Sequence, residues 1–223
     1  MEEYTGIKTL EILQDAVNYN QFIENELLDF IGSELKATDF GAGVGEFANR
    51  LRKKGVEITC VENDSSLLEN LNNQGFCSYN TIQYNTNRLY SLNVLEHIEN
   101  DVATLKEIYD KLEVGGKLFL YVPAFMCLYT NFDKHVGHFR RYKINDMQEK
   151  LQKAGFRIVR IEYADSLGFI CWYVMGKFQK VGDEINPFMV KIFDRIIFPI
   201  SRLCDLLFKK LFGKNLLVIA VRD

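Results

Sequence analysis

The stretch Asp39-Phe40-Gly41-Ala42-Gly43-Val44-Gly45 limits the possible folds more than any other part of the sequence. Residues 36–40 have the composition of a short strand, and residues 46–54 have that of a helix. Glycine permits positive φ and close approach of a ligand, and the helix that follows offers unpaired N–H groups at its positive end. The stretch predicts a strand, a ligand-binding turn and a helix, with a purely structural turn as the alternative.

Strands and helices alternate on the carboxyl side of this turn. A second strand is predicted at 56–62 and its helix at 65–74, with Asp64 or Ser65 as the N-cap. Further elements are predicted as strands at 88–93, 117–122, 156–163 and 215–221, and as helices at 101–112 and 144–154. The predicted fold class is α/β, a doubly wound, mostly parallel, seven-stranded Rossmann-like sheet with an antiparallel last strand.

The chain of 223 residues predicts a single domain spanning 1–223. Residues 1–35 are expected to form N-terminal helices, and the apolar residues 166–214 a helical insert between the last two strands. The longest strongly apolar stretch, 167–175, is shorter than the roughly 20 residues that cross a bilayer. The start of the chain lacks the pattern of a secretory signal, so a cytoplasmic protein is expected.

The composition gives no reason to expect a nucleic-acid partner or a metal ion. The net charge of −3 gives no general reason to expect nucleic-acid binding, which normally shows a basic excess on one face. The five cysteines are scattered and odd in number, with no CxxC pair or close Cys/His spacing. Free thiols and no metal are therefore expected.

A carboxylate follows the glycine-rich turn by about twenty residues. Glu62 ends the predicted second strand, where a carboxylate can accept hydrogen bonds from both hydroxyls of a ribose. A solvated surface glutamate is the alternative. The turn and the acid together predict a nucleoside-containing cofactor, although the GxGxG spacing differs from the GxGxxG of dinucleotide-binding proteins.

These residues resemble a known family. The stretch 37–51, Glu62 and the segment Ser91-Leu92-Asn93-Val94-Leu95-Glu96-His97-Ile98 resemble the three cofactor motifs of class I S-adenosylmethionine-dependent methyltransferases. The Gly115-Gly116 turn also matches that family, and residues 133–142 resemble the DxxxGHxRRY segment of one bacterial subgroup. The resemblance implies a methyltransferase with S-adenosylmethionine as its cofactor.

Site residues follow from the same resemblance. It implies that the methionine end of the cofactor is held by Asp39, Gly41 and Gly43, that the ribose is held by Glu62, and that Leu92 and Asn93 line the sulfonium side. The sequence departs from the family where Asn87 replaces the usual acid before the fourth strand. No aspartate stands near residues 78–80 for the adenine amine, where Asn80 is the substitute candidate.

Three histidines are candidates for a general base, because imidazole can take a proton near neutral pH. His97, His135 and His138 all lie in segments expected at the carboxyl ends of the strands. We assign the base to His138, with His135 as the second choice. His97 is expected either to face the sulfonium or to brace the loop.

The segment 133–142 is predicted to bind the acceptor, since it gathers charged, imidazole and aromatic groups after a predicted strand. Arg140 and Arg141 could fork onto a carboxylate or phosphate, with Asp133 and Tyr142 as further contacts. The alternative is that one arginine pairs with Asp133 and the other with solvent, and that Tyr142 only packs. Either arrangement would shape a loop beside the cofactor.

The apolar insert has a cationic character. From 187 to 212, polar residues recur every three to four positions, and six lysines and arginines, counting Lys214, accompany two acids. Such helices could lie in a membrane interface, form a homodimer or pack on the protein's own core.

The leading hypothesis is methyl transfer to a hydroxyl of a small molecule, sugar or lipid-linked acceptor, with N-methylation as a variant. The enzyme would then be cytoplasmic and could lie at the inner face of the membrane. A non-catalytic protein of the same fold, acting in binding or assembly, is the alternative. A dinucleotide-dependent oxidoreductase is disfavoured by the glycine spacing.

Overall fold

The computed structural model describes residues 16–176 and 187–223 and contains the predicted α/β sheet. The seven strands lie in the order β3-β2-β1-β4-β5-β7-β6. Strands β1 to β5 are parallel where they pair, and β7 is antiparallel to both β5 and β6. The strands are β1 Lys36–Phe40, β2 Glu57–Val61, β3 Cys77–Tyr79, β4 Thr86–Leu92, β5 Leu112–Pro123, β6 Arg157–Ala164 and β7 Asn215–Val221.

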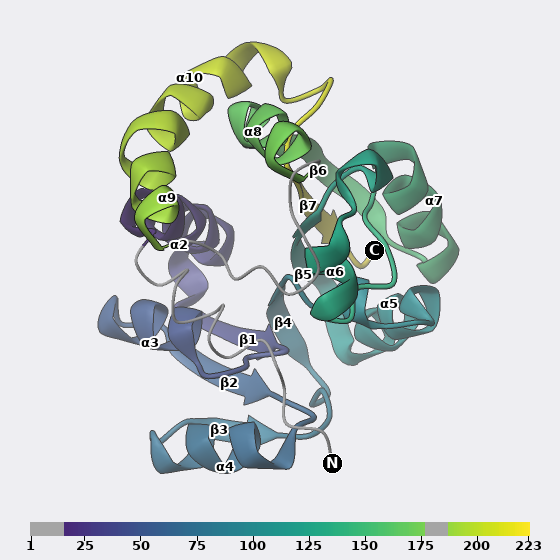
Figure 1. Ribbon diagram of the computed structural model, residues 1–223. Helices are drawn as coiled ribbons and strands as arrows, with labels where there is room; N and C mark the ends of the chain where they lie inside the picture. The colour runs from purple at the N-terminus through teal and green to yellow at the C-terminus, as the bar shows by residue number, and fades with distance from the viewer. Residues whose placement is uncertain (1–15, 177–186) are drawn as a thin grey trace.

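Helices cover both faces of the sheet, as Figure 1 shows. One face carries α2 (Val17–Ile31), α3 (Glu46–Lys53) and α4 (Ser65–Asn73), and the other carries α5 (Asp101–Lys111) and α7 (Ile144–Ala154). Neighbouring strand residues point to opposite faces. In β4, Leu89 belongs to the core beneath α5 and α7, whereas Tyr90 belongs to the core beneath α2 and α3.

Short-range signals predicted most element boundaries. Asp64 caps α4, because its Oδ1 accepts hydrogen bonds from Ser66 N at 2.8 Å and Leu67 N at 3.1 Å. Two features differ from prediction. The sequence predicts no residue range for β3, which has three residues and exposed ends, and β5 begins at Leu112, five residues before the predicted start.

The predicted insert between β6 and β7 is helical in its described part. It contains α8 (Ser166–Gly176), α9 (Pro187–Ile192), the π-helical η4 (Phe193–Ile197) and α10 (Phe198–Phe208). Within the described residues, no helix is both long and apolar enough to cross a membrane. Of the predicted N-terminal helices, α2 and the short η1 (Gly32–Glu34) are described, whereas residues 1–15 and 177–186 lie outside the described part.

Two buried aspartates fasten the insert to the sheet domain. Asp194 accepts hydrogen bonds from the backbone N–H groups of Asn18 at 3.0 Å and Tyr19 at 2.9 Å, at the start of α2. Asp205 accepts from the N–H groups of Asp165 at 2.9 Å and Ser166 at 2.8 Å, at the start of α8. Carboxylates are stabilised at helix N-termini by the unpaired N–H groups there. Both acids of residues 187–212 are therefore used inside the protein.

Candidate functional site

The glycine-rich turn lies between β1 and α3, at the carboxyl edge of the parallel strands. Gly41, Gly43 and Gly45 have φ of 79°, 55° and 80°, a region that favours glycine. A Cβ on Gly41 would lie 2.4 Å from Cγ2 of Val94, so that glycine is required by packing. A Cβ on Gly43 would meet no atom within 4 Å. The backbone at Gly43 is therefore open to a ligand.

Glu62 lies directly beside this opening. Its Oε2 accepts a hydrogen bond from Gly43 N at 2.8 Å, and its Oε1 accepts from Asn63 N at 2.8 Å and Asp64 N at 3.0 Å. These bonds fix the carboxylate at the end of β2 while the side chain stays partly exposed. A fixed, partly exposed carboxylate can accept hydrogen bonds from a diol.

Asp39 is the buried acid of the turn. It is 4% exposed, and burial raises the pKa of its carboxyl to about 7, with the nearby Tyr90 hydroxyl acting in the opposite direction. A carboxyl with such a pKa takes up a proton on folding between about pH 4 and pH 7. The stability that this proton provides is present below the unfolded pKa and is lost as the pH rises through 7.

We predict that the cofactor-free protein unfolds at a higher temperature at pH 5.5 than at pH 8, and that Asp39→Asn reduces this difference. The amide cannot ionise, so the variant should gain stability relative to wild type at pH 8. Thermal unfolding at both pH values measures this, with the exposed Asp146→Asn as the control. An equal pH dependence in wild type and Asp39→Asn would contradict the assignment.

Leu92 and Asn93 complete the edge at the end of β4. Asn93 is exposed, has φ of 53° and donates its backbone N–H to Tyr121 O at 2.8 Å. The structure thus places all six residues predicted for the cofactor at the carboxyl ends of β1, β2 and β4. Asn87 lies at the opposite end of β4, where its amide donates to Glu113 Oε2 at 3.1 Å. The departure from the family pattern at that position is remote from the glycine-rich turn.

Two histidines, His97 and His138, lie near the same edge and form the histidine pair. Nδ1 of His138 is 2.8 Å from Oδ1 of Asp133, which Arg141 also contacts through Nε at 2.7 Å and Nη2 at 3.0 Å. Burial alone would raise the pKa of Asp133, but the hydrogen bonds from His138 and Arg141 outweigh it and lower the pKa. An ionised Asp133 only accepts hydrogen bonds, so Nδ1 of His138 is the donor in this contact and Nε2 is the ring nitrogen that it leaves available.

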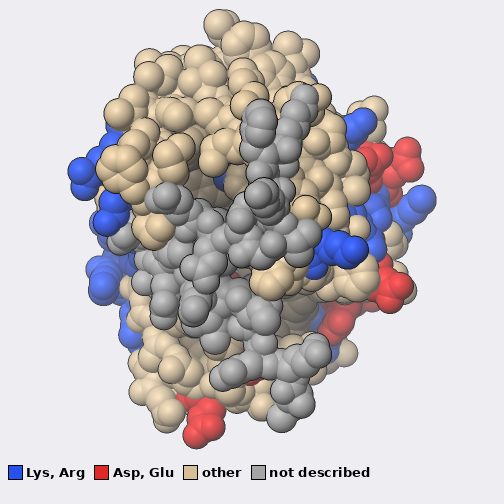
Figure 2. Space-filling model, viewed as in Figure 1, with Lys and Arg blue, Asp and Glu red and all other residues tan. Residues whose placement is uncertain are grey.

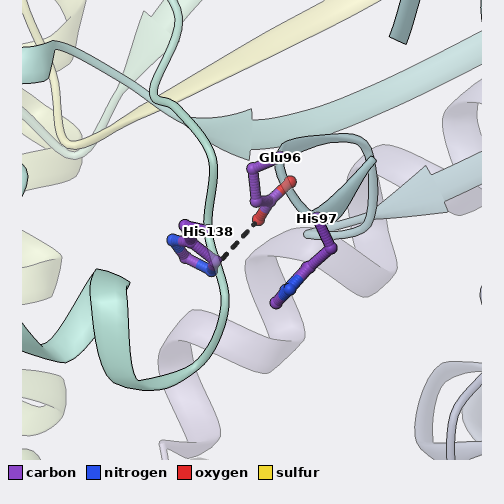
Figure 3. Close-up of side chains that lie close together, drawn as sticks. All are labelled: Glu96, His97 and His138. Atoms are coloured by element: carbon purple, nitrogen blue, oxygen red, sulfur yellow. Dashed lines mark ion pairs between the residues drawn. The ribbon is translucent and has the colours of Figure 1, made fainter. Parts of the chain in front are cut away.

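Glu96 faces the imidazole ring of His138 from the segment that follows β4, as Figure 3 shows. Its side chain is completely buried, and neither carboxyl oxygen has a hydrogen-bond partner. Oε1 lies 3.8 Å from His138 Nε2, beyond hydrogen-bond distance. Burial raises the pKa of Glu96 to about 8. The sequence placed Glu96 in a motif but gave it no role, because only the fold reveals its burial.

The two other histidines, His97 and His135, differ in their burial and in their position relative to His138. His97, in η2 (Leu95–His97), has its ring centroid 4.6 Å from that of His138, and burial and the neighbouring His138 lower its pKa to about 4. The carbonyl groups of Val136 and Gly137 also act on its ring. His135 is exposed in the last turn of α6 (Asn131–His135) and does not join the pair. The structure therefore brings together two of the three candidate bases.

Glu96, His97 and His138 also offer three donor atoms within 4.8 Å of one another, so they could hold a metal ion. The 3.8 Å between Glu96 Oε1 and His138 Nε2 exceeds the roughly 3 Å between adjacent ligands at about 2.1 Å from an octahedral ion. A metal would thus require side-chain movement. The expected metal-free reaction stays a prediction.

The predicted acceptor residues are mostly engaged inside the protein. Asp133, Arg141 and Tyr142 are at most 5% exposed, and the Tyr142 hydroxyl lies 3.0 Å from Asp101 Oδ2. Arg140 also contacts Asp101 Oδ2, at 2.8 Å. The pairing of one arginine with Asp133 agrees with the alternative interpretation, but the other arginine pairs with Asp101 rather than solvent. These contacts hold the loop in shape, and the role of Asp133, Arg140, Arg141 and Tyr142 in binding the acceptor stays a prediction.

A cavity of about 380 Å³ lies beside this loop, between α8 and the segment that includes η3 (Met126–Leu128) and the start of α6. The Tyr129 hydroxyl on its wall donates to the backbone carbonyl oxygen of His138 at 2.6 Å, which holds the cavity wall against the loop that carries His138. Trp172 Nε1 donates to Leu128 O at 3.0 Å across it. The lining residues are Cys127, Leu128, Tyr129, Thr130, Asn131, Lys134, Trp172 and Tyr173. Sequence reasoning missed this cavity because its walls come from distant segments.

A family model described as a methyltransferase domain matches residues 18–161, which include the turn, Glu62 and the histidine pair. The chain belongs to this family. It is a class I S-adenosylmethionine-dependent methyltransferase, and S-adenosylmethionine is its methyl donor. The competing hypotheses of an oxidoreductase and of a non-catalytic protein are thereby set aside.

Solved structures share the fold of this methyltransferase at low sequence identity. An enzyme of this class from Thermotoga maritima is 13% identical with a TM-score of 0.61, over 97% of this chain and 95% of its own. One from Archaeoglobus fulgidus is 17% identical with a TM-score of 0.59, over 91% and 94%. Phosphoethanolamine N-methyltransferase 2 from Haemonchus contortus is 16% identical with a TM-score of 0.58, over 92% and 52%. No curated protein matches the sequence.

The residues at the turn fit S-adenosylmethionine. The open backbone at Gly43 admits the cofactor's polar groups, and the fixed carboxylate of Glu62 can accept hydrogen bonds from the ribose hydroxyls. The positive N-terminus of α3 follows directly.

Proposed function

We propose that this methyltransferase methylates a hydroxyl group of a lipid-linked, sugar-like acceptor, with His138 as the general base. The observation that carries the proposal is the Asp133–His138 contact, which occupies Nδ1 of His138 and leaves its Nε2, 3.8 Å from Glu96 Oε1, as the ring nitrogen that could take a proton. S-adenosylmethionine, when bound, supplies a methyl group on a positively charged sulfur. The protein mainly aligns the acceptor and removes its proton.

His138 and the three residues around it each have a distinct role in this proposal. Nε2 of His138 would take the proton of the acceptor hydroxyl. Asp133 holds the imidazole in the required tautomer and stabilises the positive charge that forms on it. Arg141 keeps Asp133 ionised and fixed through two hydrogen bonds. Glu96, mostly uncharged at neutral pH, adds little negative charge that would hold the proton on His138.

The lining of the cavity supports a sugar-like acceptor. Trp172 and Tyr173 offer aromatic faces, whereas Thr130, Asn131 and Lys134 offer hydrogen-bonding groups. Aromatic faces combined with a few placed polar groups suit a ring that carries several hydroxyls. Tyr173 is also 43% exposed on α8, so the cavity wall continues onto the outer surface of the insert. An acceptor attached to a lipid could reach the cavity from that side.

The proposal is tested by incubating the protein with methyl-labelled S-adenosylmethionine and either a bacterial lipid extract or a water-soluble metabolite fraction. We expect label in the lipid fraction, in a product that resists alkali, because ethers survive conditions that cleave methyl esters. Label recovered only on an amine would instead favour N-methylation, the reaction named for one of the similar structures.

A variant of the cavity wall makes the same experiment specific. Trp172→Ala should raise the KM for the labelled acceptor about tenfold, since an aromatic contact is worth up to about 1.5 kcal/mol. The affinity for S-adenosylmethionine should stay unchanged. Tyr84→Ala, which removes a 72% exposed aromatic side chain outside the cavity, is the control. An unchanged KM in Trp172→Ala would reject the cavity as the acceptor site.

A further inference from the structure

The exposed surface of the insert differs from the rest of the molecule. Large apolar side chains with at least 36% exposure are concentrated on α8, on α9 to α10 and just beyond them. In Figure 2 the upper part of the visible face, over these helices, is largely uncharged, with blue residues at its margin. The exposed apolar residues are Ile170, Tyr173, Val174, Met175, Phe188, Met189, Ile196, Ile200, Leu203, Leu206, Leu207, Phe208 and Leu211. Single exposed apolar residues are ordinary, but a contiguous group marks an interaction surface.

The helical rod 187–208 carries two opposite stripes. Its buried stripe is Asp194, Phe198, Ser201 and Asp205, at spacings of four, three and four residues. A second stripe with the same spacings, Ile196, Ile200, Leu203 and Leu207, is offset by two residues and exposed by 49–77%. An offset of two residues is about 200° around a helix, so the stripes face opposite directions. The rod is thus anchored by one face and presents apolar side chains on the other.

The charges that border the outward stripe are positive. Arg195, Arg202 and Lys209 recur every seven residues, close to two helical turns, and therefore follow one flank of the rod. Both acids of residues 187–212 point inward and cap other helices. Arg202 pairs with Asp205 at 2.5 Å and Lys209 with Glu162 at 3.1 Å, so these two cations are partly neutralised within the protein. The charged residues of this segment that are classed as exposed, Lys191, Arg195 and Lys210, are all cationic. A negatively charged and apolar partner would satisfy both parts of this surface.

We propose that the outward face of α9 to α10, with the exposed residues of α8, docks on an anionic lipid bilayer. The apolar stripe would enter the boundary between headgroups and acyl chains, and the cationic flank would contact the anionic headgroups. A second copy of this chain fits less well, because pairing through this face would bring together two surfaces whose exposed charges, Lys191, Arg195 and Lys210, are all positive. Docking places Tyr173, on the cavity wall, next to the lipid.

Vesicle flotation of the purified full-length protein tests the proposal. We expect binding to phosphatidylcholine vesicles that contain about a third phosphatidylglycerol, weaker binding to pure phosphatidylcholine, and a loss of binding as salt is raised. Neither S-adenosylmethionine nor an acceptor is present. Failure of docking would therefore leave the proposed reaction untouched, and failure of the reaction would leave docking untouched.

Matched variants distinguish vesicle binding through this surface from non-specific adsorption. Leu206→Glu combined with Leu207→Glu should abolish flotation, and Arg195→Gln should weaken it about fivefold, the effect of one cation near an anionic surface. Val114→Glu, at a 77% exposed site at the start of β5, is the control and should bind like wild type. Undiminished binding of the double variant would overturn the proposal. So would absence of wild-type binding, or a dimer in light scattering that the double variant dissociates.

Discussion

His138→Ala is expected to lower the rate of methyl transfer about 10²–10⁴-fold, the usual contribution of a positioned general base. The side chain removed is the one whose Nδ1 is fixed by Asp133 and whose Nε2 takes no part in that contact. The affinity for S-adenosylmethionine should be unchanged, because Glu62 and the glycine-rich turn follow β2 and β1, whereas His138 lies in the loop after α6. Single-turnover rates with the labelled acceptor and calorimetric titration with the cofactor measure the two quantities.

His135→Ala is the matched control, since it removes the same kind of side chain from an exposed position in the same segment. It should retain the wild-type rate. Equal losses in the two variants would show that the segment matters only for its fold. A full rate in His138→Ala would eliminate His138 as the base and would shift attention to His97.

The contrast between these two histidines explains how far sequence reasoning can reach. His135 and His138 are three residues apart, and no spacing rule separates them. The structure does so through Gly137, whose φ of 83° turns the chain after α6 and directs His138 toward Asp133. Asp133 is fixed in turn by Thr130, in a capping box that begins α6. Such local reversals decide which side chain enters a site.

The fold was predictable because its signals are local and repeated. The turn at Gly41 to Gly45, the cap at Asp64 and the alternation of strands and helices need only neighbouring residues. The roles of Asp133 and Arg141 were not predictable in the same way, because their burial depends on packing between segments far apart in sequence. Charge and residue type suggested ligand contacts, whereas the fold uses the same groups to hold the loop.

The apolar insert also has properties that the sequence predicts and others that only the fold shows. Its helical content and cationic excess are visible in the sequence, but a wide apolar face is compatible with membrane, partner or core. The answer depends on which stripe is anchored. Asp194 and Asp205 settle that point, because each caps another helix and thereby turns the opposite stripe outward. Only the folded chain shows which residues the stripe exposes.

Gly43→Ala should weaken S-adenosylmethionine binding by about tenfold to a hundredfold, if the added methyl group displaces the cofactor from one hydrogen bond between charged groups. A Cβ at Gly43 would clash with nothing in the protein and would project into the opening above the turn. Isothermal titration calorimetry measures the loss. The new methyl group would thus obstruct the cofactor rather than the fold.

Gly55→Ala supplies the control that isolates this effect. Gly55 has φ of 87° and equally open surroundings, but it lies between α3 and β2, at the other end of the strand from Glu62. Both substitutions impose a left-handed conformation on alanine and should cost a similar 1–2 kcal/mol or so of stability. Only Gly43→Ala should lose affinity. Equal affinities of the two variants for S-adenosylmethionine would attribute any loss of affinity to backbone strain. They would contradict the assignment of the turn as the cofactor site.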